Sequence, residues 1–145
     1  MKIVVITLLT CVAAIAQSPN DFRLRYGAPV SESFLVRPGI LATLNHAKDG
    51  KICSMSVAAQ SNPKFTMHNA TLISNKVMRD IVDELIPNSQ RGKLVTSGFL
   101  NLTCVRCESF YGAFEDYEKV RITIGGSSNE KQTASIEWVG VSCER

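Results

Sequence analysis

One segment of the chain has helical periodicity, whereas most of the remaining sequence alternates as strands do. Its apolar positions are Ile73, Val77, Met78, Ile81, Val82, Leu85 and Ile86. Spacings of three and four residues indicate an amphipathic helix, and Pro87 ends it because proline cannot continue a helix. The apolar stripe is too wide to face water. The rest of the chain must therefore provide a sheet on which this helix packs.

Two alternating segments, residues 40–47 and 51–58, flank the pair Asp49-Gly50. Asp-Gly tolerates the positive backbone angles of a two-residue type I′ turn, so the two segments are predicted to form a hairpin. The predicted cross-strand pairs are Ala47 with Ile52, His46 with Cys53, Leu44 with Met55, and Ala42 with Val57. This register gathers the apolar side chains on one face, in agreement with the alternation.

Further strands are predicted over residues 33–36, 99–105, 117–124 and 131–141. A helical turn over residues 20–25 is expected to end at Tyr26-Gly27-Ala28-Pro29, and residues 88–92 are expected to form a loop. The order of strands, one long helix and further strands predicts an α+β fold. Such a fold has a mostly antiparallel sheet with one principal amphipathic helix.

The first residues have the composition of an export signal. Met1-Lys2 is followed by an apolar run that ends in Ala14-Ile15-Ala16, and a signal peptidase accepts this small-x-small pattern. About 14 apolar residues are too few to span a membrane, which needs roughly 20. Cys11 is an unfavourable lipidation site because Thr10 precedes it. We predict a cleaved signal peptide over residues 1–16, a single α+β domain over 17–145, and export to a secreted or periplasmic location.

Charge and motifs exclude several classes of function. The formal net charge is only +3 and the basic residues are scattered, so nucleic acid is not an expected partner. No later apolar run is long enough to span a membrane. No phosphate-binding loop, nucleophile elbow or zinc-protease motif occurs, so neither a cofactor nor a metal is expected.

Four cysteines follow the predicted signal: Cys53, Cys104, Cys107 and Cys143. An even number in an exported domain predicts two disulfides, for which three connectivities are open. Chain entropy favours long-range pairing, such as Cys53 with Cys104 or Cys107 across a loop of about 50 residues, over a bridge within one motif.

Three other roles are open to these cysteines: redox chemistry, zinc binding and nucleophilic catalysis. Cys104-Val105-Arg106-Cys107 has the spacing of thiol oxidoreductases, but no helical pattern follows it to lower the pKa of the first thiol. A zinc site would need a second cysteine pair of the same kind. His46 opposite Cys53 resembles a base beside a nucleophile, although a packed histidine next to a disulfide is the simpler interpretation. His68 has no partner in the sequence pattern.

The remaining polar groups suggest no chemistry. Asp83-Glu84 and the cluster of Glu115, Asp116 and Glu118 are expected to be solvated. Asn69-Ala70-Thr71 and Asn101-Leu102-Thr103 match glycosylation acceptors, which matter only in a eukaryotic secretory pathway.

Four aromatic residues form the expected contact surface: Phe110, Tyr111, Phe114 and Tyr117. Aromatic side chains provide large apolar area at low entropic cost, although these rings are also suited to closing the core. The sequence predicts an exported, non-catalytic domain that binds a partner, expected to be a protein, at the cell envelope or outside the cell. The alternatives are a thiol-disulfide redox protein using Cys104 and Cys107, and a secreted inhibitor of a hydrolase.

Four short stretches resemble small exported bacterial proteins of unassigned function. They are Arg25-Tyr26-Gly27-Ala28-Pro29, Val36-Arg37-Pro38-Gly39-Ile40, Asp116-Tyr117-Glu118-Lys119-Val120 and Ser135-Ile136-Glu137-Trp138. The short helix, the turn and the hairpin are also similar to small modules of outer-membrane assembly lipoproteins. This resemblance implies an exported compartment and names no active residues.

Overall fold

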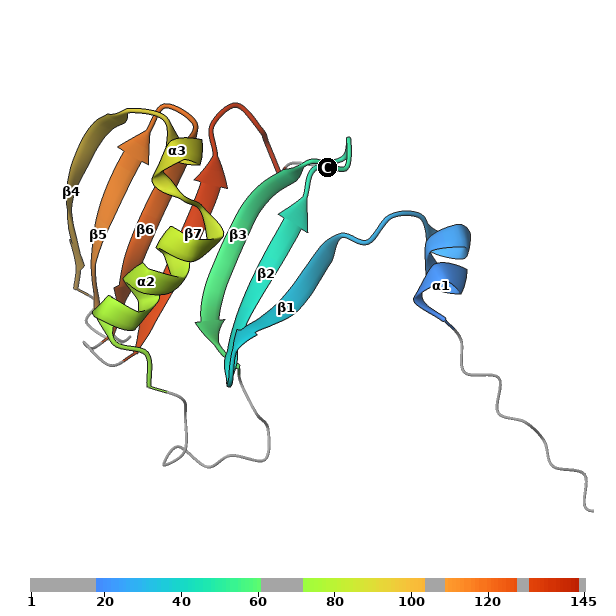
Figure 1. The fold of residues 1–145 in the computed structure, drawn as a ribbon, viewed down its shortest axis with the longest axis horizontal. Coiled ribbons are helices and arrows are strands. Elements are labelled where there is room, and N and C mark those ends of the chain that lie inside the picture. The colour runs from blue at the N-terminus through green and yellow to red at the C-terminus, as the bar shows by residue number, and fades with distance from the viewer. Residues whose placement is uncertain (1–17, 61–71, 104–108, 128–130, 144–145) are drawn as a thin grey trace, which may run out of the picture.

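The computed structural model describes residues 18–60, 72–103, 109–127 and 131–143, and Figure 1 shows its fold. The predicted signal peptide and the Cys104–Cys107 motif lie outside these ranges. Within them the chain forms one seven-stranded antiparallel sheet with short helices. The predicted antiparallel sheet is confirmed, and the fold is dominated by that sheet more than the α+β prediction implied.

The strands follow the order β1-β2-β3-β7-β6-β5-β4 across the sheet. They are β1 (Ser31–Arg37), β2 (Ile40–His46), β3 (Ile52–Ala59), β4 (Leu94–Leu102), β5 (Phe110–Tyr117), β6 (Val120–Gly126) and β7 (Gln132–Trp138). The chain therefore folds as two meanders, β1–β3 and β4–β7. Pairing of β3 with β7 joins them and leaves β1 and β4 as the two edge strands.

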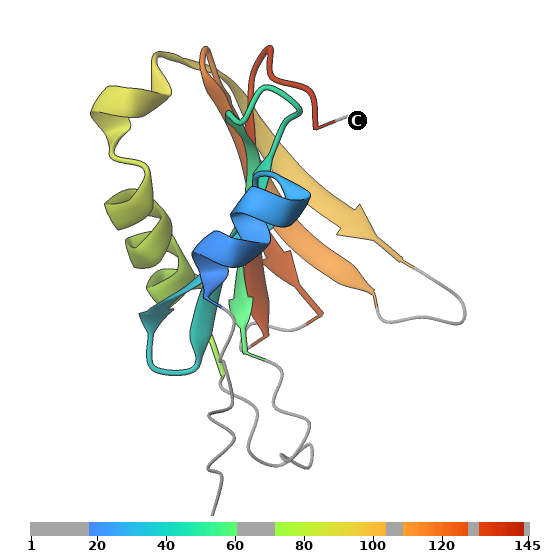
Figure 2. The same ribbon diagram turned by 90° about the vertical axis from the view of Figure 1, so that its right-hand side faces the viewer.

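The principal helix is α2 (Asn75–Leu85), and it lies across one face of the sheet where the apolar stripe predicted it (Figure 1). Ser74 caps its first turn by accepting a hydrogen bond from the Val77 amide. Met78, Ile81 and Val82 are buried against the sheet. Each such side chain stabilises the fold by about 1.5–3 kcal/mol through removal of apolar area from water. Figure 2 shows α2 on one side of the sheet, together with α3 (Asn88–Arg91).

The face of the sheet under α2 is apolar because alternate strand residues point toward the helix. The buried strand residues of this core are Ile40, Ala42, Met55, Val57, Val120, Ile122, Ile124, Ala134 and Ile136. On the opposite face, the β1–β3 meander carries polar cross-strand pairs: Ser33 bonds Thr43 at 2.9 Å, and Asn45 donates to Ser54 at 2.9 Å. One face therefore supplies the core and the other carries polar ladders.

The hairpin between β2 and β3 confirms half of the predicted register. Leu44 opposes Met55 as expected, but His46 opposes Ile52 and not Cys53. The Gly50 amide donates to the Ala47 carbonyl, and only Gly50 has positive φ in the loop, so three residues make the turn. A type I turn followed by a left-handed glycine needs one more residue than a type I′ turn. The extra residue shifts the register at the tip, and a bulge at Cys53 restores it further along.

The second meander differs from the prediction at one strand. Residues 110–117 form β5, whereas the sequence pattern predicted no strand between residues 105 and 117. The strand predicted over residues 117–124 corresponds to β6. The segment lacks alternation because Glu115 points under α2, where Arg79 pairs with it at 2.5 Å. The expected loop over residues 88–92 also contains α3. Ion pairs beneath a helix hide a strand from a pattern based on hydropathy alone.

The first helix, α1 (Pro19–Tyr26), lies beyond the β1 edge and away from the core, as Figures 1 and 2 show. It ends at Gly27, as predicted, and Ser18 and Asp21 form a reciprocal capping box at its start. Its Arg23 reaches β1 and pairs with Glu32 at 2.7 Å. Helix α1 therefore lies beside β1, one of the two edge strands.

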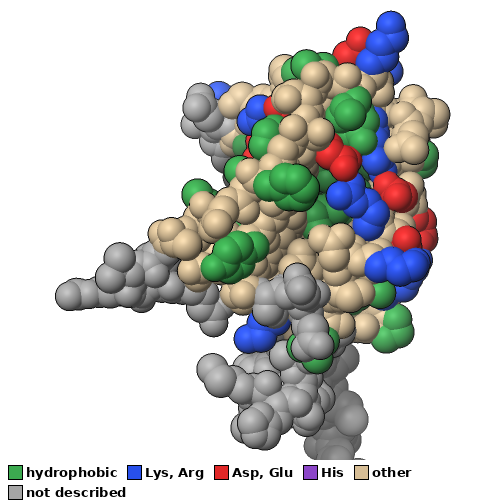
Figure 3. All heavy atoms as spheres, turned by 90° about the vertical axis from the view of Figure 1, so that its left-hand side faces the viewer, with side chains coloured by type: hydrophobic (Ala, Val, Ile, Leu, Met, Phe, Trp, Pro, Cys, Tyr) green, Lys and Arg blue, Asp and Glu red, His purple; other side chains and the backbone are tan. Residues whose placement is uncertain are grey.

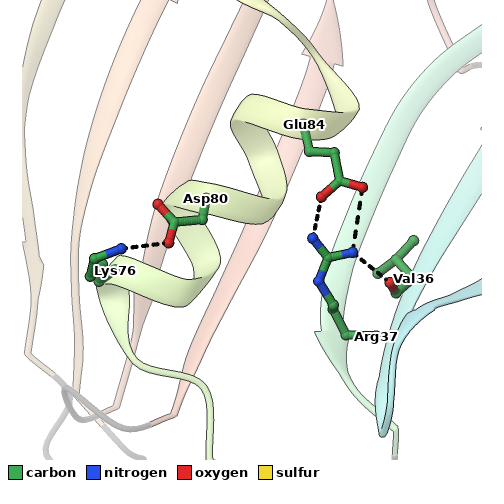
Figure 4. Close-up of polar contacts among 5 residues, drawn as sticks. All are labelled: Val36, Arg37, Lys76, Asp80 and Glu84. Carbon is green, nitrogen blue, oxygen red and sulfur yellow. Dashed lines mark hydrogen bonds and ion pairs between the residues drawn. The ribbon is translucent and has the colours of Figure 1, made fainter.

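A second ion pair ties the same edge to the core helix. Figure 4 shows Arg37, at the end of β1, with its guanidinium against the Glu84 carboxylate of α2. Arg37 also donates to the Val36 carbonyl at 3.0 Å. Lys76 and Asp80 form a separate pair one turn apart within the helix, at 2.7 Å. The β1 edge is thus held by charged contacts to both α1 and α2.

Candidate functional site

The cysteine framework is partly visible. Cys53 of β3 and Cys143 near the C-terminus form a disulfide, with Cα atoms 5.3 Å apart. Cys104 and Cys107 lie outside the described residues. Chain entropy had favoured Cys53 with Cys104 or Cys107, yet its partner is Cys143, because the segment after β7 returns to the start of β3. The bridge spans 90 residues, so it still closes a long loop.

The disulfide also limits the chemistry considered for Cys53. Its sulfur is bonded to Cys143 and the residue is buried, with 2 % of its surface exposed, so it is neither a nucleophile nor a zinc ligand in this state. His46 lies opposite Ile52 instead. His68 lies outside the described residues. Among the residues that are described, no three His, Cys, Asp or Glu side chains gather to hold a metal ion.

The carboxylates expected to be solvated are engaged in ion pairs. Asp83 accepts from buried Arg91 at 2.5 Å. Asp116 accepts two hydrogen bonds from Arg121, which lower the pKa of its carboxyl. The pKa of Glu84 is lowered in the same way by its hydrogen bonds from Arg37. These groups hold elements together. The Glu84 pair could not be predicted from a local pattern because Arg37 lies 47 residues away in the chain.

The four aromatic residues predicted as a contact surface are divided between the two faces of the sheet. Tyr111 and Tyr117 share a face with Glu115, whose cross-strand partner is the buried Ile122. Phe110 and Phe114 alternate with them and point to the opposite face. The Tyr117 hydroxyl donates a hydrogen bond to Glu115 at 2.9 Å. The Tyr117 ring therefore lies on the face of the sheet that α2 covers. Only Tyr111 of the four is more than a third exposed, at 50 %.

Phe110 and Phe114 cover glycines of neighbouring strands. A Cβ at Gly125 would lie 2.5 Å from the Phe110 ring and 2.6 Å from the Tyr111 carbonyl. A Cβ at Gly98 would lie 2.8 Å from the Phe114 ring. The rings therefore lie flat on the sheet, where glycine alone leaves room for them. They cover the face of the second meander that points away from α2, so these two rings do not close the core.

Several exposed apolar side chains lie on β4, the edge strand of this meander. Its exposed side chains are Leu94 (55 %), Val95 (68 %), Phe99 (91 %) and Leu102 (62 %). The strand has nine residues and none is charged or proline. Figure 3 looks at this edge and shows hydrophobic side chains spread over it, with charged side chains grouped toward the top and one side. An edge of this kind is a template for another strand.

A hollow of about 630 Å³ lies beside Phe99, between β4, β5 and the start of α2. Amide side chains of Asn75, Asn101 and Gln132 and the ring of Tyr111 line it, and no lining residue is charged. Asn101 and Tyr111 are direct cross-strand partners. The hollow combines apolar area with neutral donors and acceptors, which suits a polar uncharged side chain.

The sequence contains a signal for β4 that begins before the predicted strand. Phe99, Leu102 and Leu94 belong to a run without charge, and β4 was expected to begin only at residue 99. Its position at an edge could not be predicted, because that depends on which strands of the two meanders pair. Asn101, a possible glycosylation acceptor, lies in this strand and is exposed.

Neither a known protein family, nor a curated protein, nor a solved structure matches this chain. In the described part of the chain, no helix is both long and apolar enough to cross a membrane.

Proposed function

We propose that this protein is an exported binding domain, and that its partner protein adds an extended segment to the outer edge of β4. The observation that carries the proposal is Phe99, 91 % exposed in the middle of a nine-residue uncharged edge strand. Burying one phenylalanine side chain contributes about 1.5–3 kcal/mol. Strand addition supplies affinity through backbone hydrogen bonds and specificity through alternate side chains.

The side-chain pattern of β4 defines the partner. Ser97, Phe99 and Asn101 pair with β5 residues on the α2 side, whereas Gly98 and Leu100 pair on the opposite side. A docked strand alternates in the same way. On the α2 side we expect an apolar residue beside Phe99 and, next to it, a polar uncharged residue that enters the amide-lined hollow.

A second copy of this chain is the rival occupant. Antiparallel self-pairing centred on Phe99 would place Ser97 of the second copy opposite Asn101. Serine would occupy less of the hollow of about 630 Å³ than a longer polar side chain would. A different partner strand with a larger amide or hydroxyl side chain fits better.

The test is selection of random decapeptides against the purified protein, followed by affinity measurement on variants. Phe99→Lys places a charge on the edge and should weaken the selected peptides at least tenfold. Phe34→Lys on β1, where Phe34 is 49 % exposed, is the matched control and should leave affinity unchanged.

Two results would contradict the proposal. In the first, selected peptides bind the Phe99→Lys variant as tightly as the original protein. In the second, sedimentation shows a dimer that Phe99→Lys dissociates, which would assign the edge to a second copy.

A further inference from the structure

The histidine at the end of β2 lies between hydrogen-bond acceptors from two other parts of the chain. Its Nδ1 lies 3.3 Å from the carbonyl oxygen of Gly50 in the β2–β3 turn, and its Nε2 lies 3.9 Å from Oε2 of Glu32 on β1. The backbone amide of His46 donates to the Val30 carbonyl at 3.1 Å, so the end of β2 is next to the start of β1. Strand addition at β4 makes no use of this arrangement, because β4 is the opposite edge of the sheet.

The protonation state of the ring decides how many of these acceptors it can serve. Carbonyl and carboxylate oxygens only accept hydrogen bonds, whereas a neutral imidazole has one N–H donor and one acceptor nitrogen. Neutral His46 can therefore donate to Gly50 or to Glu32, and its second nitrogen then faces an acceptor with no proton between them. The imidazolium has two N–H donors and can serve both. Histidine is also the side chain that ordinarily changes charge between pH 5 and 8.

The burial of Nε2 makes this choice matter for the fold. The atom is buried and has no hydrogen-bond partner among the described residues. Leaving a buried polar atom unpaired is unfavourable, since water does not replace the missing bond. The side chains of His46 and Glu32 are only 18 % and 29 % exposed, so solvent screens their attraction incompletely. A small rotation of the Glu32 carboxylate would bring it to the roughly 2.8 Å of a charge-assisted hydrogen bond.

The other charged groups at this end of the sheet come from α1 and from the turn. Arg23 of α1 pairs with Oε1 of Glu32 at 2.7 Å and leaves Oε2 to the imidazole ring. Lys51 and Asp49 of the turn pair with each other at 2.8 Å, so their charges offset. Lys48 borders the same hollow as the ring, and its positive charge opposes protonation, as that of Arg23 does. Among the described residues, Glu32 is the carboxylate that pairs with the ring.

We propose that His46 is a pH-responsive latch between β1, β2 and the β2–β3 turn. At acidic pH its imidazolium donates to the Gly50 carbonyl and to the Glu32 carboxylate together. At higher pH the ring keeps the proton on Nδ1 and the bond to Gly50, and it loses the contact with Glu32. Protonation adds a contact in the folded state, so the latch is closed at low pH and opens as the pH rises. The start of β1 is the part of the edge that it holds or releases.

NMR of the imidazole nitrogens tests the chemistry on the unaltered protein. At pH 8 the ¹⁵N resonances of His46 should show a proton on Nδ1 only, and at pH 5.5 they should show protons on both nitrogens. A proton on Nε2 at pH 8 would mean that the contact with Glu32 forms without a change of charge, which would overturn the latch. A ring that remains neutral at pH 5.5 would overturn it as well.

Hydrogen exchange tests the consequence for the edge strand. After correction for the intrinsic effect of pH on exchange, protection within residues 31–35 should be about fivefold higher at pH 5.5 than at pH 8. His46→Gln and Glu32→Gln should each lower this ratio to about one. If either variant fails to fold, the NMR result on the unaltered protein still decides the question.

Two matched controls separate the latch from its surroundings. Arg23→Gln removes the other partner of Glu32 and leaves His46 in place, so the ratio should persist. His68→Gln removes the second histidine of the chain and should also leave it unchanged. A ratio that survives in folded His46→Gln would contradict the proposal. A ratio that is lost in Arg23→Gln and kept in His46→Gln would assign the effect to the ion pair between α1 and β1 instead.

Discussion

The two edges of one sheet are built in opposite ways. β1 carries Glu32 and Arg37, and both are paired, with Arg23 of α1 and Glu84 of α2. β4 is longer, has no charged residue, and exposes Phe99 almost completely. Natural sheets protect edge strands with charge or with covering elements. The contrast supports the proposal that a partner strand pairs with β4 in preference to β1.

The largest expected effect comes from the Cys53–Cys143 disulfide, which would join the two meanders in addition to the pairing of β3 with β7. Removing the disulfide with Cys53→Ala and Cys143→Ala should lower the free energy of unfolding by about 4 kcal/mol, because the bridge closes a 90-residue loop. The measurement is denaturant unfolding of the double variant and of the unaltered protein. A loss below about 1 kcal/mol would show that the β1 side does not depend on the bridge.

A second prediction concerns the glycines that support the β4–β6 surface. Gly125→Ala should destabilise the fold by about 1–3 kcal/mol, since the new Cβ would approach the Tyr111 carbonyl and Gly112 Cα as well as the Phe110 ring. Gly98→Ala is the matched control, because its closest contacts are atoms of the Phe114 ring, which can move. Equal losses in thermal unfolding would contradict the difference between backbone and ring contacts.

The turn near the β1 side gives a third prediction. Gly50→Val should cost more than about 1 kcal/mol because φ is 82° there, a region that β-branched residues resist. No atom lies within 4 Å of the added Cβ, so the loss reports backbone strain alone. Gly50→Asn should recover part of the stability, since asparagine tolerates this region. If a denaturant melt shows no loss of stability for Gly50→Val, the positive φ at this position does not limit which residue the turn accepts.

The smallest expected effect separates binding from folding at β4. Phe99→Lys should change the free energy of unfolding by no more than about 0.5 kcal/mol, because its ring is 91 % exposed. Phe34→Lys, half-exposed on β1 opposite Ala42, should cost more. If Phe99→Lys is the more damaging change in thermal unfolding, the ring serves the fold and the contrast between the edges fails.

The sequence predicted individual helices and strands better than the pairing between them. The stripe from Ile73 to Ile86 located α2, and Leu44 opposite Met55 followed from alternation. The turn at Gly50 was displaced by one residue because a three-residue loop and a two-residue loop share the Asp-Gly signal. Strand β5 was missed because Glu115 is neutralised by Arg79, which is 36 residues away in the chain.

The candidate sites were less predictable for the same reason. Tyr111 was named as a contact residue and does line the hollow beside β4, but Phe99 and Asn101 were not. Their exposure depends on β4 lying last in the sheet. His46 was considered with Cys53, whereas its neighbour in space is Glu32 of β1. Local patterns specify strands, and long-range pairing specifies which side chains meet.

Hydrogen exchange with a selected decapeptide tests the central claim most directly, because it reports which edge of the sheet becomes covered. Bound peptide should slow amide exchange at least tenfold within residues 94–102, where a new strand would accept and donate backbone hydrogen bonds. Exchange within residues 31–37 should stay unchanged. Protection of β1 in place of β4, or binding without protection of either edge, would contradict the assignment of β4 as the open edge of this protein.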